Sequence, residues 1–330
     1  MRFAPLLAAA ALALSGAAAR AQDAADLARR LGSAARWDAG SGTMEFRSDV
    51  RFSFGRGMAR DSIWEVPPAV RRVVIDEGVR VTGAFTTHSS LDVEGRGPSS
   101  EIYGTPQAGL LQGLGLGHDG LTMPYSAVFA EGGGIVVNVR NLTSRDPLGP
   151  HFTGYGAVFH LEDVRAIDDR GGFSNHSDGL AAAAGSTVNR CFFSTGDDVI
   201  KVYKDITVTD TAIEMIMNAV PIQLGWSGYG DGARGVFQNV RITGSLGRRD
   251  DRPVIEAYAG SYKKELVIDG LTVDNPSASL FNFRDAGANI YVKIEHADIR
   301  VKRYANELKA AHVLLVCDTQ DRRASFQCGR

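Results

Sequence analysis

The chain has 330 residues, with 36 Lys and Arg against 38 Asp and Glu and a formal net charge of −2. A charge this close to neutral gives no support for nucleic acid or an anionic surface as partner. Beyond the N-terminus no stretch approaches the roughly 20 apolar residues of a membrane span, so we expect none in the mature protein.

The N-terminus has the pattern of an export signal. Met1-Arg2 is a short basic start, residues 6–14 form an apolar run too short to cross a bilayer, and Ala19-Arg20-Ala21 is a small-x-small cleavage site. We therefore expect a signal peptide at 1–21 and a secreted or periplasmic protein. Loss of its two arginines moves the formal charge to about −4.

The remaining residues, 22–330, are expected to form a single domain with an N-terminal cap region over 22–69. Within that region residues 23–35 carry Leu27, Leu31 and Ala35 at helical spacing. A short amphipathic helix here would cover the open end of a β-structure. Residues 37–60 are interpreted as an edge strand or a capping loop.

From Val70 onward, short Val- and Ile-rich strands alternate with Gly and polar turns. A weak repeat consists of a strand, a polar or small dipeptide and a second strand, with the second dipeptide residue at positions 141, 163, 190, 210, 239, 270 and 297. The gaps of 22, 27, 20, 29, 31 and 27 residues are typical of solenoids. We predict an all-β parallel β-helix. The alternative, a β-sandwich, should show turn signals every 8–12 residues, which fits less well.

The Gly-rich stretch from Pro98 to Tyr125 is not explained by this repeat and is expected to be a long excursion or lid. Three cysteines occur. Cys317 and Cys328 are a disulfide candidate in an exported protein, whereas Cys191 is expected to be a buried thiol. No pair has zinc-ligand spacing and no His cluster forms a metal site, so we expect no cofactor.

Three acids stand out in the middle of the chain. Asp178 is followed after 19 residues by Asp197-Asp198, and 19 residues is about one coil of a parallel β-helix. Strands on adjacent coils lie about 4.8 Å apart, so the three carboxyl groups would meet on one outer face. Like charges this close raise at least one pKa, which provides a proton donor beside carboxylates that can activate water. Calcium binding is the alternative for such a cluster.

An adjacent Asp pair is a weak signal by itself, because Asp168-Asp169 and Asp250-Asp251 also occur and a solvated turn is the default. Further residues are expected to bind substrate near the acids. Alternation along the strand from Val199 points Val199, Lys201 and Tyr203 outward, although Lys201 can equally be a surface lysine paired with an acid. The other candidates are Gln223, Trp226, His176, Tyr229 and Tyr258. Trp226 could instead pack under a loop, and His176 could instead be an ordinary turn residue.

These residues carry a resemblance. Asp178-Gly179, the run from Asp197 to Tyr203, Gln223-Leu224-Gly225-Trp226 and, upstream, residues 78–86 resemble the core of glycoside hydrolase family 49, the dextranases and isopullulanases. The resemblance implies a right-handed parallel β-helix and inverting hydrolysis of α-glucan linkages. It implies that Asp197 is the general acid and that Asp178 and Asp198 activate water. The related polygalacturonases carry Gly-His-Gly and Arg-Ile-Lys motifs that are absent here, which disfavours a uronic-acid substrate.

We therefore expect an exported, monomeric hydrolase that cleaves α-1,6 linkages in a polysaccharide or oligosaccharide. One alternative is a hydrolase of another bacterial glycan with the same mechanism. Another is a non-catalytic glycan-binding β-helix, which would not need all three acids. A polysaccharide lyase is a third, although lyases on this scaffold normally need calcium or a basic residue beside a uronate.

Overall fold

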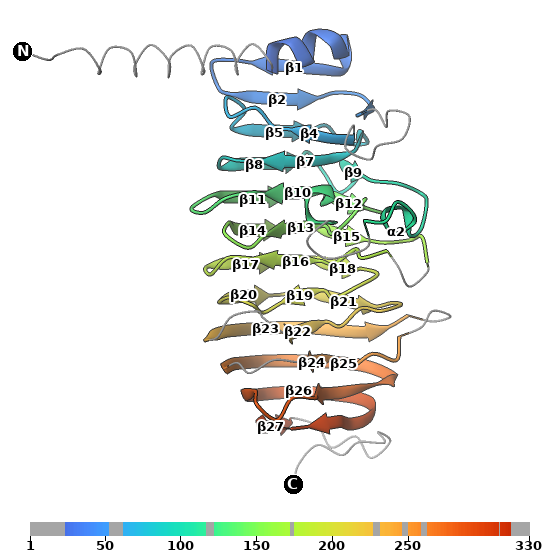
Figure 1. Cartoon of the computed structure of the whole chain (residues 1–330), viewed down its shortest axis with the longest axis vertical. Helices are drawn as coiled ribbons and strands as arrows, with labels where there is room; N and C mark the ends of the chain where they lie inside the picture. Colours follow the sequence, from blue (N-terminus) through green and yellow to red (C-terminus); the bar gives the residue numbers. More distant parts are fainter. Residues whose placement is uncertain are drawn as a thin grey trace, which may run out of the picture.

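The computed structural model describes residues 24–52, 62–116, 122–171, 175–226, 232–245, 250–258, 263–309 and 311–317. The predicted signal peptide at 1–21, Tyr229 and Cys328 lie outside these residues. Figure 1 shows a tall stack of coils with the N-terminal helix at one end and β27 at the other. No helix within the described ranges is long and apolar enough to cross a membrane.

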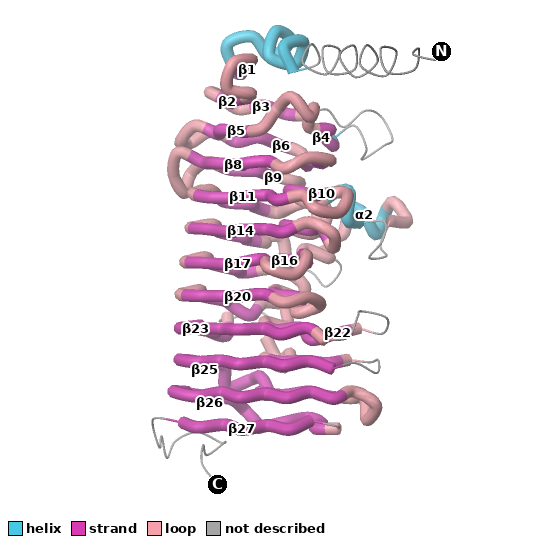
Figure 2. Tube along the Cα trace, turned by 90° about the vertical axis from the view of Figure 1, so that its left-hand side faces the viewer, coloured by secondary structure: helices cyan, strands magenta, loops and turns pink. Residues whose placement is uncertain are grey.

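The N-terminal end of the stack is covered by a helix at residues 24–31, which confirms the predicted capping helix (Figures 1 and 2). Its buried residues Ala24 and Leu27 belong to the main hydrophobic core. The helix ends before Ala35 because Gly32, which has a φ of 59°, opens the 3-10 turn Gly32–Ala34. The chain then enters β1 (Ala35–Asp38), which pairs antiparallel with β2 (Thr43–Phe46).

The coils form three ladders of parallel strands, which confirms the predicted parallel β-helix (Figure 2). The first ladder contains β2, β5 (Arg72–Ile75), β8 (Leu91–Gly95), β11 (Val136–Arg140), β14 (Val158–Glu162), β17 (Ser186–Asn189) and β20 (Ile206–Thr209). The second contains β3 (Val50–Arg51), β6 (Arg80–Thr82), β9 (Glu101–Tyr103), β12 (Thr143–Arg145), β15 (Arg165–Ile167), β18 (Phe192–Ser194) and β21 (Ala212–Met215).

The residues of the acidic motif come just before two strands of the third ladder. It contains β4 (Ile63–Glu65), β7 (Ala84–Thr87), β10 (Val128–Ala130), β13 (Phe152–Gly154), β16 (Leu180–Ala182), β19 (Ile200–Lys201), β22 (Ile222–Gly225) and β24 (Ile255–Ala257). Toward the C-terminus the ladders are continued by longer strands, β23 (Ala233–Gly244), β25 (Lys263–Phe283) and β26 (Asn289–Leu308), and β27 (Ala311–Cys317) pairs with β26.

The repeat read from the sequence corresponds to the corner between the first two ladders. From β11 onward, one residue at each of these corners has a left-handed backbone with φ between 49° and 76°, at positions Asn141, Asp163, Arg190, Asp210, Asn239, Gly270 and His296. Asn, Asp and Gly tolerate this conformation better than other residues, which is why a polar or small dipeptide marks each coil. The predicted positions therefore match the corners, except that the last lies at 296 rather than 297.

Alternation along the first ladder fills the interior. Buried apolar side chains stack in register from coil to coil at Val139, Leu161, Val188, Val208, Phe237, Ile268 and Ile294. Burial of each contributes on the order of 1.5–3 kcal/mol, so the stack provides a rigid base for the strands of the third ladder. Cys191 packs into this core as the predicted buried thiol, and burial raises its pKa to about 12.

The excursion predicted over Pro98 to Tyr125 leaves the coil only after β9. It contains the short helix α2 (Leu110–Gly113) and the 3-10 turn η3 (Met123–Tyr125). Leu111 and Tyr125 pack with Ala84 and Leu148 in a small second apolar cluster, which attaches the excursion to the coils. The backbone N–H of Gly109 also donates to Oδ1 of Asn175 (3.0 Å), so the excursion reaches the turn before Asp178.

Candidate active site

The register of the third ladder brings the three acids together. Leu180 of β16 lies opposite Ile200 of β19, and the N–H of Gly179 donates to the carbonyl of Asp198 (2.9 Å). Continued back by two residues, this register places Asp178 opposite Asp198, with Asp197 one residue earlier. Each of the three carboxyl groups has an oxygen within 4.8 Å of the others. The coil offset is therefore 20 residues rather than 19.

Asp197 has the surroundings of a proton donor. Burial raises its pKa well above 3.8, and the neighbouring charges of Asp178 and Asp198 raise it further. The amide Nδ2 of Asn218, one coil later, donates to its Oδ1 (2.9 Å). Nδ1 of His176 lies 3.6 Å from its Oδ2, so the structure places His176 at this acid. A carboxyl group whose pKa is raised in this way is suited to general acid chemistry.

Asp198 lies on the other side of the cluster. Burial raises its pKa to about 7, against the opposing effect of Lys201. Its Oδ2 accepts a hydrogen bond from Nε1 of Trp226 (3.3 Å), a donor that favours the ionised carboxylate. Asp198 can therefore exchange its proton in the neutral range, where a base is most effective.

Asp178 is paired with Lys201. The Nζ of Lys201 lies 2.6 Å from Oδ1 of Asp178, and both side chains are 9% exposed. Burial disfavours the charged lysine, but the surrounding charges, of which Asp178 is the largest, together outweigh burial and hold the pKa of Lys201 well above 10.5. The ammonium group therefore stays charged, and it compensates one of the three clustered carboxylates.

Two aromatic pairs flank the acids. The ring of Trp226 stacks on Tyr258 with centroids 4.0 Å apart and planes at 24°, and the guanidinium of Arg284 lies 4.5 Å over the Tyr258 ring. Tyr203, which is buried, stacks on Tyr155 at 6.3 Å. Burial raises the pKa of Tyr203 far above its ordinary value. The rings of Trp226 and Tyr258 thus form a platform that is joined to Asp198 by the indole N–H.

Gln223 lies beside Lys201 in the ladder and is completely buried. Its Oε1 accepts from the N–H of Gly225 (3.1 Å), whereas its Nε2 has no hydrogen-bond partner within the described part of the chain. An unpaired buried amide donor is costly, so this side chain has a hydrogen bond left to offer. The next residue of this ladder, Glu256, is also completely buried and pairs with Arg252 and Arg284.

Two expectations from the sequence are wrong in detail. Val199 points into the hydrophobic core rather than outward, because β19 contains only Ile200 and Lys201 and the alternation does not extend back to Val199. Asp168 is not in a solvated turn: its side chain is 0% exposed and pairs with Arg170. Cys317 lies in β27, but its predicted partner Cys328 is outside the described residues, so this disulfide stays a prediction, as does the role of Tyr229.

The same three carboxylates are the group of described residues whose donor atoms lie close enough together to hold a metal ion. The ammonium group of Lys201 lies 2.6 Å from Asp178, where it takes up space beside the carboxylates and neutralises part of the negative charge that would attract a cation. The donor set is thus better matched to proton transfer than to a calcium site.

The fold and the cluster define a parallel β-helix with a buried carboxylate site on the outside of one sheet. No protein-family model matches the chain. Two dextranases match a 94-residue segment: that of Arthrobacter sp. (strain CB-8) is 32% identical and that of Arthrobacter globiformis 29% identical. The segment is 28% of this chain but 14% of each relative's length.

Among solved structures, Dex49A from Penicillium minioluteum superposes with a TM-score of 0.56 at 16% identity, over 80% of this chain and 55% of that one. The chain thus spans about half the length of this structure. The likeness shows the shared fold, and with the dextranase segments it confirms the predicted resemblance to glycoside hydrolase family 49.

Several residues at the site carried no clear sequence signal. Asn218 lies 21 residues after Asp197, about one coil, but a single Asn at that spacing is not distinctive. Tyr155 and Arg284 belong to coils before and after the motif, and only the coil register shows their relation to the rings of Tyr203 and Tyr258. Pairing Asp197 with residues 20–31 positions away, the coil lengths in this chain, would have revealed Asn218.

Proposed function

We propose that this chain is a glycoside hydrolase that acts on a glucan, with an α-1,6-linked, dextran-like polysaccharide or oligosaccharide as substrate. The observation that carries the proposal is the three-carboxylate cluster, in which burial and the two neighbouring acids raise the pKa of Asp197 and Asp178 is paired with Lys201. The dextranase segments and the fold of Dex49A support this choice of substrate class.

The residues divide the work as follows. Asp197 donates its proton to the glycosidic oxygen as the bond to the anomeric carbon breaks. Asp198, with a pKa of about 7, takes a proton from the attacking water, and Asp178 orients that water. Lys201 compensates the charge of Asp178 through their ion pair, and His176 and Asn218 hold the carboxyl group of Asp197.

The distance between the acid and the base constrains the stereochemistry of the reaction. Inverting enzymes separate acid and base by roughly 6.5–9.5 Å so that water fits between them. The nearest carboxyl oxygens here approach within 4.8 Å, so inversion requires the water to be bound at the outer oxygens of Asp178 and Asp198. We propose inversion, which proton NMR of the first-formed anomer tests directly: retention of the α-configuration would refute it.

Substrate binding is assigned to the groups around the acids. Trp226, whose ring is backed by Tyr258, provides a flat apolar face for a sugar ring, and Gln223 lies beneath the site with an unpaired Nε2 donor that becomes available to a sugar hydroxyl when its side chain turns outward. Arg284, which lies over the Tyr258 ring, is paired with Glu256, and Arg252 pairs with the same acid, which suits a neutral sugar rather than a uronate.

The deciding experiment is Asp197→Asn assayed by reducing ends released from a panel of α-glucans that includes dextran. We expect the variant to lose at least about 1,000-fold in kcat, since loss of the acid removes both its proton and its electrostatic effect. The matched control is Asp298→Asn, an exposed Asp on β26, which should keep full activity. Full activity in Asp197→Asn would overturn the mechanism.

The panel also decides between related functions. Cleavage of another bacterial glycan but of no α-glucan would keep the chemistry and change the substrate. Binding without cleavage would indicate a glycan-binding β-helix, and ultraviolet absorbance of an unsaturated product would indicate a lyase. We further propose that the protein is exported as a monomer after cleavage near residue 21, which N-terminal sequencing of the secreted protein and its sedimentation would test.

A further inference from the structure

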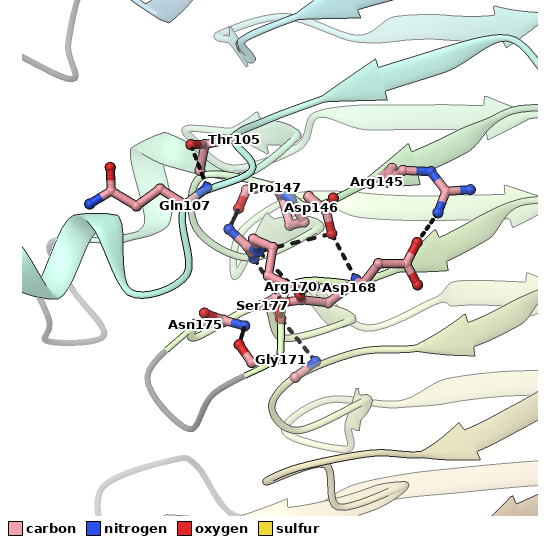
Figure 3. Close-up of polar contacts among 12 residues, drawn as sticks. Thr105, Gln107, Arg145, Asp146, Pro147, Asp168, Arg170, Gly171, Asn175 and Ser177 are labelled. Carbon is pink, nitrogen blue, oxygen red and sulfur yellow. Dashed lines mark hydrogen bonds and ion pairs between the residues drawn. The ribbon is translucent and has the colours of Figure 1, made fainter. Parts of the chain in front are cut away.

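A buried polar network of Asp168, Arg170 and Ser177 lies next in sequence to the acids (Figure 3). Ser177, the residue before Asp178, donates its hydroxyl proton to Oδ2 of Asp168. The same hydroxyl oxygen accepts a hydrogen bond from the N–H of Gly196, the residue before Asp197 (2.9 Å). One side chain thus joins the coil of Asp178 to the coil of Asp197, and it is completely buried.

The direction of these hydrogen bonds is fixed by charge. Asp168 is bound by Arg170 through Nη2 (2.7 Å), Nε (3.1 Å) and the backbone N–H (3.0 Å). Burial raises the pKa of Asp168, but the bonds and charge of Arg170 outweigh this effect and hold it below 3.8. An ionised carboxylate only accepts, so the single proton of the Ser177 hydroxyl points to Asp168 and its lone pair is left for Gly196.

The ion pair is itself anchored in the body of the β-helix. Arg170 is 2% exposed at its side chain and Asp168 0%. Nη1 of Arg170 donates to the carbonyl of Pro147 on the preceding coil (2.8 Å), and Oδ1 of Asp146 accepts from the N–H of Asp169 (2.7 Å). Figure 3 shows Ser177 at the edge of this cluster. The cluster is held in place by its hydrogen bonds to Pro147 and Asp146 of the preceding coil.

The approach at Gly196 leaves no room for a side chain. A Cβ there would lie 2.7 Å from Oγ of Ser177 and 3.0 Å from both Oδ2 of Asp168 and Cε of Met217. The backbone of the turn before Asp197 therefore packs directly against Ser177. Its position depends on the contact between Gly196 and the Ser177 hydroxyl.

We propose that Ser177, held by the Asp168–Arg170 ion pair, is a positioning residue that fixes the distance between Asp178 on one coil and Asp197 on the next. The role rests on the proposed hydrolase function, because it assigns a purpose to the spacing of the three carboxyl groups. Ser177 acts through the backbone of the neighbouring residues and is not assigned a contact with substrate.

The test compares Ser177→Ala with Ser186→Ala. Ser186 is a matched control: it is equally buried, accepts from the N–H of Phe159 on the previous coil (3.0 Å) and donates to the carbonyl of Ala183 (2.7 Å), but it lies on the first ladder. Both variants lose one serine bridge between coils, so both should lose similar thermal stability.

The kinetic and titration results should differ. We expect Ser177→Ala to lose between about tenfold and 100-fold in kcat with little change in KM, since small misplacements of reacting groups are costly. Ser186→Ala should keep its kcat. Carboxyl carbon NMR of Asp-labelled protein should show shifted titration of the acidic cluster in Ser177→Ala only. Equal kcat and unchanged titration in the two variants would overturn the proposal.

The two readouts separate this inference from the function on which it rests. If the wild-type protein cleaves no glycan of the panel, the proposed function fails, and the titration alone decides whether Ser177 sets the carboxyl spacing. If the wild type is active and Ser177→Ala loses stability alone, the hydrolase assignment holds and Ser177 is only a structural residue.

Discussion

Lys201 and Asp178 form a nearly buried ion pair on adjacent coils, with Nζ 2.6 Å from Oδ1. The lysine compensates one carboxylate in a place where three would otherwise repel one another. Removing one partner of a buried pair is far more damaging than removing both, because the remaining charge stays desolvated. The pair therefore links stability and chemistry at the site.

Lys201→Met is expected to lower the free energy of unfolding by about 3–5 kcal/mol and to reduce kcat by more than about 100-fold. The double variant Lys201→Met with Asp178→Asn, which removes both charges, should regain part of the stability and none of the activity. Urea unfolding and dextran assays of the two variants check this prediction. A single variant within about 1 kcal/mol of wild type would contradict it.

The raised pKa of Asp198 predicts that this residue lowers the free energy of unfolding increasingly as the pH rises. An acid whose folded pKa, about 7, exceeds its ordinary value of 3.8 contributes stability below pH 3.8 and loses it as pH rises to about 7. Asp198→Asn removes this titration, so it should be more stable than wild type at pH 8 by more than about 1 kcal/mol, with a smaller gain at pH 5. Urea unfolding at both pH values tests this, and Asp298→Asn should show no such difference.

Trp226 contributes through two separable contacts. Trp226→Phe keeps a ring on Tyr258 but loses the indole N–H to Asp198, so the pKa of Asp198 should rise and the ascending limb of kcat/KM should move to higher pH. Trp226→Ala also loses the ring, and its KM should increase by about fivefold or more. Identical pH profiles for the Phe variant and the wild type would show that the N–H has no influence on Asp198.

Arg170 should be essential for the stability of the turn region. Arg170→Met leaves the carboxylate of Asp168 buried without its cation, at an expected cost of about 3–5 kcal/mol. Arg190→Met is the comparison, because Arg190 pairs with Glu162 and Asp163 on the surface and should cost no more than about 1 kcal/mol. Comparable losses in urea unfolding would mean that burial of the Asp168 pair has no special effect.

Much of the fold could be predicted because its determinants are local. The left-handed corners require residues that tolerate positive φ, so Asn141, Asp163 and Asn239 marked the coils in the sequence. The capping helix was visible from the apolar spacing of Leu27 and Leu31 alone. Arg190 at a corner was located only through the dipeptide pattern, since arginine has no preference for this conformation.

The site was predicted less completely, because its details depend on contacts across coils. The acids were grouped correctly by their spacing, but a one-residue difference in coil length decides that Asp198, not Asp197, lies opposite Asp178. Asp168 was assigned to solvent because an isolated Asp pair is usually exposed. Its burial follows from Arg170 folding back onto it and from Ser177 nine residues later, which sequence spacing does not reveal.

The left-handed corners have an evolutionary consequence. Successive corners are separated by as few as 20 residues, from Arg190 to Asp210, and by as many as 31, from Asn239 to Gly270, yet the strands on either side remain in register. Differences in length are thus absorbed in the connections outside the ladders. A protein built this way can exchange the loops around its acids, and with them its preferred sugar, while inheriting the spacing of the acids unchanged.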